Sequence, residues 1–138
     1  MNKKEILAFL NAHPECHVAT MDGNMPRVRG LKMHKADEKG LIFQVWTIKD
    51  VGKQLLKNPA AEVCFNDYEK GIQIRVNGKL ELVKDEALKK EVMDARPFLK
   101  PFVDQVGFDK FIIFRMAKGK AHVYTNADNF TPKTWIEL

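Results

Sequence analysis

Basic side chains and one hydroxyl flank two apolar segments in the first half of this chain of 138 residues. One segment is rich in arginine and ends in a lysine, and the other is aromatic and precedes a threonine and two lysines. Arginine and lysine suit a phosphate, and an apolar strand surface suits a flat aromatic ring. We therefore predict a site for an anionic aromatic ligand. Its candidate residues are Arg27, Arg29, Lys32, Thr47, Lys49 and Lys53.

The phosphate of this ligand is expected at the start of a short helix. Asp50 has the side chain of an N-cap residue, and the helix is expected to stop at Asn58 and Pro59. Lys53 then lies in the first turn, where a phosphate would receive backbone N–H groups and a lysine together. In the alternative interpretation, Lys49 and Lys53 are solvated surface lysines, and the sequence leaves both interpretations open.

The arginine-rich segment is predicted to be a strand, which limits what its cations can reach. Successive side chains of a strand point to opposite faces, so the odd spacing of Arg27 and Lys32 separates them. A bulge at Gly30 would bring the two side chains together, and without it only one of them touches the ligand. Arg27 and Arg29 share one face, for which a surface role and a site role are equally compatible.

The remaining pattern predicts a mainly β chain with peripheral helices. Helices are expected over residues 2–12 and, after the cap Asp85, to residue 95. Strands are expected over residues 16–21, 26–33, 41–46, 61–66, 71–83, 111–116 and 120–125. The last two are expected to pair as a hairpin around Lys118 and Gly119. About six antiparallel strands joined by tight turns predict a small closed or partly closed barrel, as a single domain over residues 1–138.

Residues 71–83 show the clearest strand pattern. Aliphatic residues occupy one face, while Gln73 and Arg75 occupy the other. This polar face is open to solvent in one interpretation, and in the other it lies against a ligand or a second subunit. A tryptophan in such a strand is more often a core residue, so Trp46 is expected in the core, and stacking on a cofactor is the alternative.

Composition excludes several classes of protein. The net charge of +5 comes mainly from scattered lysines, which favours a solvated surface over nucleic-acid binding. Cys16 and Cys64 are expected to be free thiols, and neither they nor His13 and His17 have the spacing of a metal site. No signal peptide and no apolar run of about 20 residues is present, so we expect a cytoplasmic protein. No hydrolase or nucleotide-loop motif occurs.

Taken together, these segments resemble the pyridoxamine 5'-phosphate oxidase-like family of flavin-binding split barrels. The stretch from Arg27 to Lys32, with Val28 and Arg29 inside it, is similar to that family's Arg-x-x-x-x-Lys strand. Trp46 and Thr47, with Lys53 after them, resemble its phosphate-binding turn and helix. Residues 71–81 resemble its long strand, whose glutamine reaches the flavin, and the helix-rich piece with Arg96 and Pro97 also has a counterpart.

The resemblance implies a homodimer with FMN at the subunit interface. Arg27 and Lys32 would contact the ring or the phosphate, and Thr47, Lys49 and Lys53 would hold the phosphate and ribityl end. Gln73 would reach the ring from the partner subunit. The implied activity is that of an FMN-dependent oxidoreductase acting on a small molecule through N5 of the flavin.

The chain also departs from the oxidase. Gly52 stands before Lys53, where the oxidase has an arginine, and the C-terminal residues lack the oxidase's substrate-binding arginine. Oxidation of pyridoxamine phosphate is therefore not expected. A flavin-binding or haem-binding stress protein without turnover is the alternative, and His17 or His122 would be the axial ligand of a haem.

Overall fold

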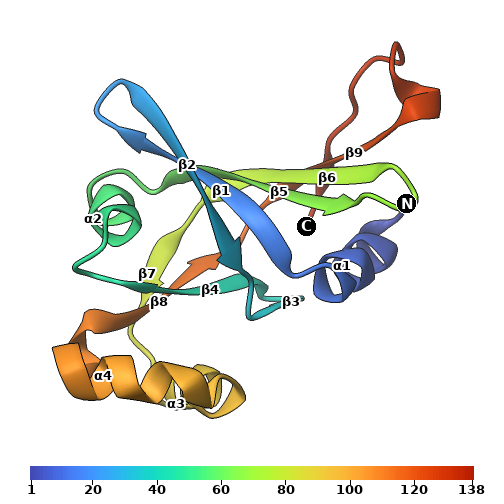
Figure 1. The fold of residues 1–138 in the computed structure, drawn as a ribbon. Coiled ribbons are helices and arrows are strands. Elements are labelled where there is room, and N and C mark those ends of the chain that lie inside the picture. Colours follow the sequence, from blue (N-terminus) through green and yellow to red (C-terminus); the bar gives the residue numbers. More distant parts are fainter.

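The computed structural model describes residues 1–138 and places ten strands in two antiparallel sheets. The first sheet has the order β10-β9-β6-β5-β1-β2 and the second the order β3-β4-β8-β7 (Figure 1). The strands of the first sheet are β1 (Glu15–Asp22), β2 (Met25–Lys32), β5 (Ala60–Asp67), β6 (Ile72–Lys79), β9 (Lys120–Thr125) and β10 (Ile136–Glu137). Those of the second are β3 (Lys35–Asp37), β4 (Gly40–Trp46), β7 (Glu81–Val83) and β8 (Phe111–Met116). The predicted antiparallel barrel is confirmed, with ten strands in place of about six because several are only two or three residues long.

Four α-helices flank the sheets, and α3 and α4 lie on the side of the second sheet that faces away from the first (Figure 1). They are α1 (Lys3–Ala12), α2 (Asp50–Lys57), α3 (Glu86–Ala95) and α4 (Lys100–Val106). Single-turn helices cover Pro97–Leu99, Phe108–Lys110 and Asn126–Asp128. None of the helices combines the length and the apolar character needed to cross a membrane.

The predicted helix starts were correct at two places and wrong at one. Asn2 and Glu5 form a capping box at α1, and the Asp85 carboxylate accepts the Leu88 N–H at α3. Asp50 is not a cap, because it is the first residue of α2 itself. Lys49 occupies the cap position, and no side chain bonds the first turn of that helix.

The core lies between the two sheets and follows the alternation of the strands. In β1, Cys16, Val18 and Thr20 point inward and are buried. Phe43, Phe65 and other fully buried side chains complete a cluster of 21 residues, and burial of each large apolar side chain stabilises the fold by roughly 1.5–3 kcal/mol. A second, smaller cluster packs α3 against the outer side of β4 and β8.

One predicted strand and one predicted hairpin were wrong, both where the chain passes between the sheets. The strand expected over residues 71–83 breaks at Leu80, whose N–H donates to the Pro59 carbonyl, so that β6 and β7 lie in different sheets. The expected final hairpin does not form, because β8 pairs with β4 and β7 while β9 pairs with β6 and β10. The turn at Lys118 and Gly119 is therefore a corner between sheets.

A close approach between α2 and the end of β4 positions the start of this helix. Gly52 is buried in the first turn, and a Cβ at this position would collide with the carbonyl oxygen of Trp46. Only a glycine therefore allows the helix to lie this close to the strand. The glycine that separates this chain from the arginine-bearing oxidase pattern thus has a structural reason.

We expect Gly52→Ala to destabilise the protein, although alanine is the better helix former by about 1 kcal/mol. A backbone carbonyl cannot rotate out of the way, and overpacking costs roughly 1–3 kcal/mol. Urea unfolding should show a net loss of about 1 kcal/mol or more in the free energy of unfolding. Gly30→Ala is the control, because its Cβ would meet nothing nearer than the Cys16 carbonyl oxygen at 3.9 Å. Equal stability of the two variants would contradict this account.

Candidate functional site

Two hollows adjoin at the start of α2 and share Ile48, Lys49 and Val51. The first, which we call the basic groove, runs between the β1–β2 hairpin and α2. The second, the apolar cleft, extends from the beginning of β1 and the end of β4 to α4. Because they share these residues, the two hollows are neighbours, which is the arrangement that a ligand with two different ends requires.

The basic groove carries more positive than negative side chains. Its lining cations are Arg27, Arg29, Lys49, Lys53 and Lys57, against the two carboxylates of Asp22 and Asp50. The first intrahelical bond of α2 is donated by the Lys53 N–H, so the preceding N–H groups of the helix start have no partner within the helix. Uncapped N–H groups beside exposed lysines are what a phosphate requires.

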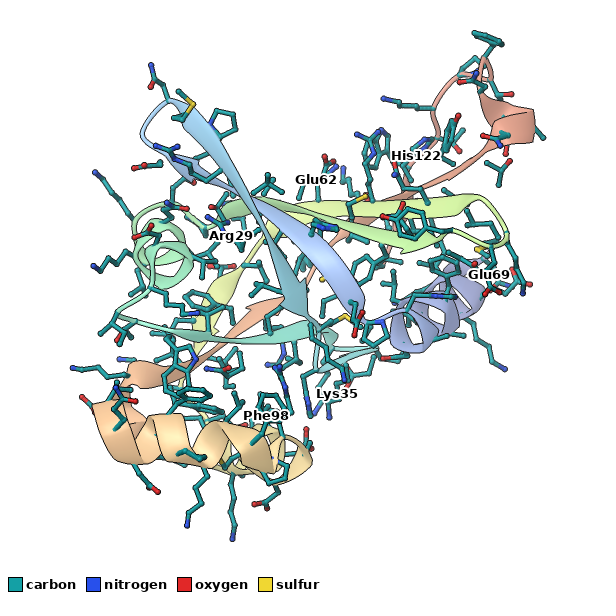
Figure 2. All side chains as sticks on the ribbon, viewed as in Figure 1. Arg29, Lys35, Glu62, Glu69, Phe98 and His122 are labelled. Carbon is teal, nitrogen blue, oxygen red and sulfur yellow. The ribbon has the colours of Figure 1, made fainter.

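Arg29 has a structural role in the wall of this groove. Its guanidinium donates to the Val18 carbonyl at 3.2 Å, to Thr20 Oγ1 at 2.7 Å and to Gln54 Oε1 at 2.7 Å. Figure 2 shows Arg29 beside α2, where these bonds join the helix to β1 and β2. Burial lowers the pKa of Arg29, and the nearby Asp50 carboxylate counteracts this effect. Most of its donors are therefore already used.

Arg27 remains the arginine that is open to a ligand. Only its Nε bonds within the chain, to Asp22 Oδ2 at 3.3 Å, and 54% of its side chain is exposed. The β1–β2 register is continuous from Glu15–Lys32 to Asp22–Met25, so the possible bulge at Gly30 does not form. Arg27 and Lys32 accordingly line different hollows, Arg27 the groove and Lys32 the cleft.

The apolar cleft offers a surface for a flat ring. Trp46 lines it and makes ring-edge contacts to Phe102 and Phe111 at centroid distances of 6.5 and 5.5 Å. Leu99 and Val106 add further apolar surface. Trp46 is half-buried and lines the cleft, and its stacking on a cofactor stays a prediction.

Arg96 is a cation in the cleft that was not among the candidate residues. It follows α3, its guanidinium lies 5.1 Å from the centre of the Phe98 ring, and its Nε is buried without a hydrogen-bond partner. Burial lowers the pKa of Arg96. Phe102 was missed as well, because the two prolines near it, Pro97 and Pro101, indicated only a short helical or irregular piece and no place in a site.

The structure brings the sequence candidates together unevenly. Val28 lines the groove with Arg27, Arg29, Lys49 and Lys53, whereas Lys32 and Trp46 line the cleft. Thr47 lines neither hollow, although it follows Trp46 directly and its N–H donates to the Lys110 carbonyl. Gln73 also lies outside both, where its side-chain amide donates to Asn66 Oδ1 at 3.0 Å.

The cysteines and the buried histidine have structural surroundings. Cys16 and Cys64 are free thiols that lie on opposite faces of the first sheet. Burial raises the pKa of Cys16 to about 12. His122 bonds the Thr134 carbonyl through Nδ1 at 3.1 Å and packs against Trp135, so one of its ring nitrogens is already occupied.

Comparison with known proteins shows the family to which the chain belongs. A sequence model described as pyridoxamine 5'-phosphate oxidase matches residues 3–105. The chain belongs to this family. A pyridoxine/pyridoxamine 5'-phosphate oxidase of Agrobacterium fabrum is 31% identical over 70 residues, a segment that covers 50% of this chain and 34% of that protein. The chain thus matches about a third of the length of this curated family member.

Solved structures share the fold over nearly the whole chain. A NimC/NimA family protein from Clostridium acetobutylicum is 25% identical with a TM-score of 0.78, covering 98% of this chain and 92% of that one. A protein related to general stress protein 26, from the same organism, is 19% identical with a TM-score of 0.70, covering 98% of this chain and 92% of that one. A FAD-binding protein from Mesorhizobium loti is 18% identical with a TM-score of 0.67, covering 89% of this chain and 94% of that one. The pyridoxamine 5'-phosphate oxidase family fold is therefore confirmed.

We expect the two arginines of β2 to separate by function when each is replaced by methionine. Arg29→Met removes three hydrogen bonds of a charged donor and should lower the free energy of unfolding by roughly 1.5–3 kcal/mol. Arg27→Met should change it by less than about 0.5 kcal/mol, because this side chain is exposed. Urea unfolding of both variants measures the difference. A larger loss for Arg27→Met would refute the structural role of Arg29.

Proposed function

We propose that this protein binds FMN and is an oxidoreductase that reduces or oxidises a small molecule through the flavin. The observation that carries the proposal is the contact at Lys49 between a basic groove and an apolar cleft. A flavin mononucleotide has the same two parts, a dianionic phosphate and a flat, mostly apolar ring. Family membership over residues 3–105 supports the same ligand.

The residues of the groove fit the phosphate. Lys49, Lys53 and Arg27 are exposed, and the uncapped start of α2 presents N–H groups between them. Each charge-assisted hydrogen bond to a phosphate contributes more than a neutral one. Arg29 takes part chiefly by holding α2 in place.

The cleft fits the ring. Trp46 supplies an apolar surface, Lys32 stands at one wall, and Thr47 follows at the junction with α2. When bound there, FMN would supply hydride transfer, and the chain would supply position, positive charge and exclusion of water. Positive charge near the ring would stabilise an anionic reduced flavin.

A homodimer is part of the proposal. The outer face of the first sheet carries half-exposed residues, among them Ala19, Cys64, Gln73 and Arg75. Gln73 does not itself line either hollow of its own chain, and we propose that it approaches the ring bound by the partner subunit. Packing of two such faces would bring it toward the partner's cleft.

The substrate is proposed to differ from pyridoxamine phosphate. The family match ends at residue 105, and the residues beyond it carry only one arginine, Arg115, which lies in β8. The C-terminal segment instead projects from the body after β9 before the chain returns to β10 (Figure 1). A NimC/NimA protein and a stress-related protein among the similar structures show that this fold is not restricted to the oxidase.

The test of FMN binding is an absorption spectrum of the protein after incubation with FMN and desalting. We expect retained flavin bands, and Lys53→Ala should raise the dissociation constant by about 10–100-fold, the loss of one charged hydrogen bond. Lys133→Ala is the matched control, since Lys133 is exposed and lines neither hollow. No retained flavin in the wild type, or equal dissociation constants for the two variants, would refute the site.

Bleaching of the bound flavin by NAD(P)H, and recovery of its absorbance with an acceptor, would separate an enzyme from a carrier.

Light scattering with FMN present should give twice the chain mass of 15.9 kDa. Ala19→Arg would place a charge on the outer face of the first sheet and should yield monomer, while its proximity to the Glu62 carboxylate allows the single chain to fold. Lys90→Glu on the exposed side of α3 is the control and should remain dimeric. A wild-type mass of one chain would refute the dimer.

A further inference from the structure

His13 follows α1 at one wall of the apolar cleft, and a carboxylate stands behind its ring. Its Nε2 lies 3.5 Å from Asp67 Oδ2, and its imidazole packs on Phe9 with the ring centres 4.5 Å apart. About a third of the side chain, 32%, is exposed, and it is exposed into the cleft. The ring is thus held on two sides and accessible on another.

Asp67 is well suited to hold this ring, because its own position is determined by the turn after β5. Its Oδ1 accepts the backbone N–H groups of Glu69 at 3.1 Å and Lys70 at 3.0 Å. Only 10% of its side chain is exposed. The turn therefore uses one carboxylate oxygen and leaves the other for the imidazole.

The remaining ring nitrogen of His13 has no partner within the chain. No hydrogen bond involves its Nδ1, and the other titratable groups that line the cleft make none with His13. These groups are Glu15, Cys16, His17, Lys32, Lys49, Tyr68 and Arg96. The contact with the Asp67 carboxylate is made by Nε2, so Nδ1 is the ring nitrogen that is free to pass a proton to a molecule in the cleft.

We propose that His13 is the proton donor to the substrate in the apolar cleft, with Asp67 as its positioning residue. This inference rests on the proposed flavin-dependent function. With Trp46 assigned to the flavin ring, the remaining aromatic and aliphatic surface at Phe102 and Leu99 favours a planar carbonyl compound, such as a para-quinone, as the substrate class.

The step balances with the reduced flavin as the reductant. The quinone would receive a hydride, which is two electrons and one proton, at one oxygen, and a proton from His13 at the other. Both C=O bonds would then become C–O–H bonds, the two electrons would come from the reduced flavin, and the His13 imidazole would be left neutral. Solvent would restore the His13 proton through the open side of the cleft.

The activity test mixes anaerobically reduced, FMN-loaded protein with 1,4-benzoquinone and follows the return of flavin absorbance. We expect His13→Gln to slow this step by about 10²-fold or more, the usual contribution of a general acid. His34→Gln is the matched control and should match the wild type, because His34 pairs with Glu91 on α3 and lines neither hollow. Asp67→Asn should give an intermediate rate, since asparagine keeps the oxygen that the turn requires.

Nitrogen NMR of labelled histidine, on the protein without FMN, gives a second and independent measurement. The neutral His13 ring should carry its proton on Nε2 in the wild type and lose this preference in Asp67→Asn. A wild-type ring protonated on Nδ1, or His13→Gln that reacts as fast as the wild type, would overturn the proton donor while leaving FMN binding intact. A wild type that retains no flavin would instead refute the proposed function, which the binding spectrum shows before any His13 variant is made.

Discussion

The hydrogen bonds of the Arg29 guanidinium are the interaction on which the geometry of the candidate site depends. They join the Val18 carbonyl and Thr20 of β1 to Gln54 of α2. A fourth bond, from Thr20 Oγ1 to Gln54 Oε1 at 2.6 Å, closes the network. A half-buried cation without hydrogen-bond partners would cost free energy, so these bonds stabilise the Arg29 charge in this position. The start of α2 is thereby held at the edge of the barrel.

The second constraint on α2 comes from the opposite side, where Gly52 meets the Trp46 carbonyl. The helix is therefore placed between a polar network and a steric contact. Lys49 and Lys53 are carried on this helix and remain free, whereas Arg29 does not. One half-buried cation, Arg29, therefore orders the groove, and the exposed cations are left to bind.

Local signals in the sequence were sufficient to predict most of the elements, and they placed most of the candidate site residues on walls of the two hollows. Capping residues, proline stops and alternating strands are short-range patterns, and so α1, α3 and the main strands were predicted correctly. The partner strands of β8 were not, because a tight turn at Gly119 looks the same in a hairpin and at a corner between sheets.

Contacts between distant segments were beyond such patterns. The sequence suggested Arg29 as a ligand residue, and only the fold reveals that Gln54 accepts from it. The pairing of His13 with Asp67 joins α1 to a turn more than 50 positions later, and no spacing rule could have indicated it. Arg96 was noted only beside its proline, because its place in the cleft depends on how α3 packs on the second sheet.

The position of β2 in the first sheet gives its charges another consequence. This strand lies at the end of the strand order, so its outer edge carries unpaired backbone groups that could recruit a strand from another molecule. Pro26 lacks an N–H, and Arg27, Arg29 and Lys32 add charge along the same edge. The residues that suit an anionic ligand thus also discourage edge-to-edge aggregation, and any evolutionary exchange of the ligand for a neutral one would have to preserve that protection.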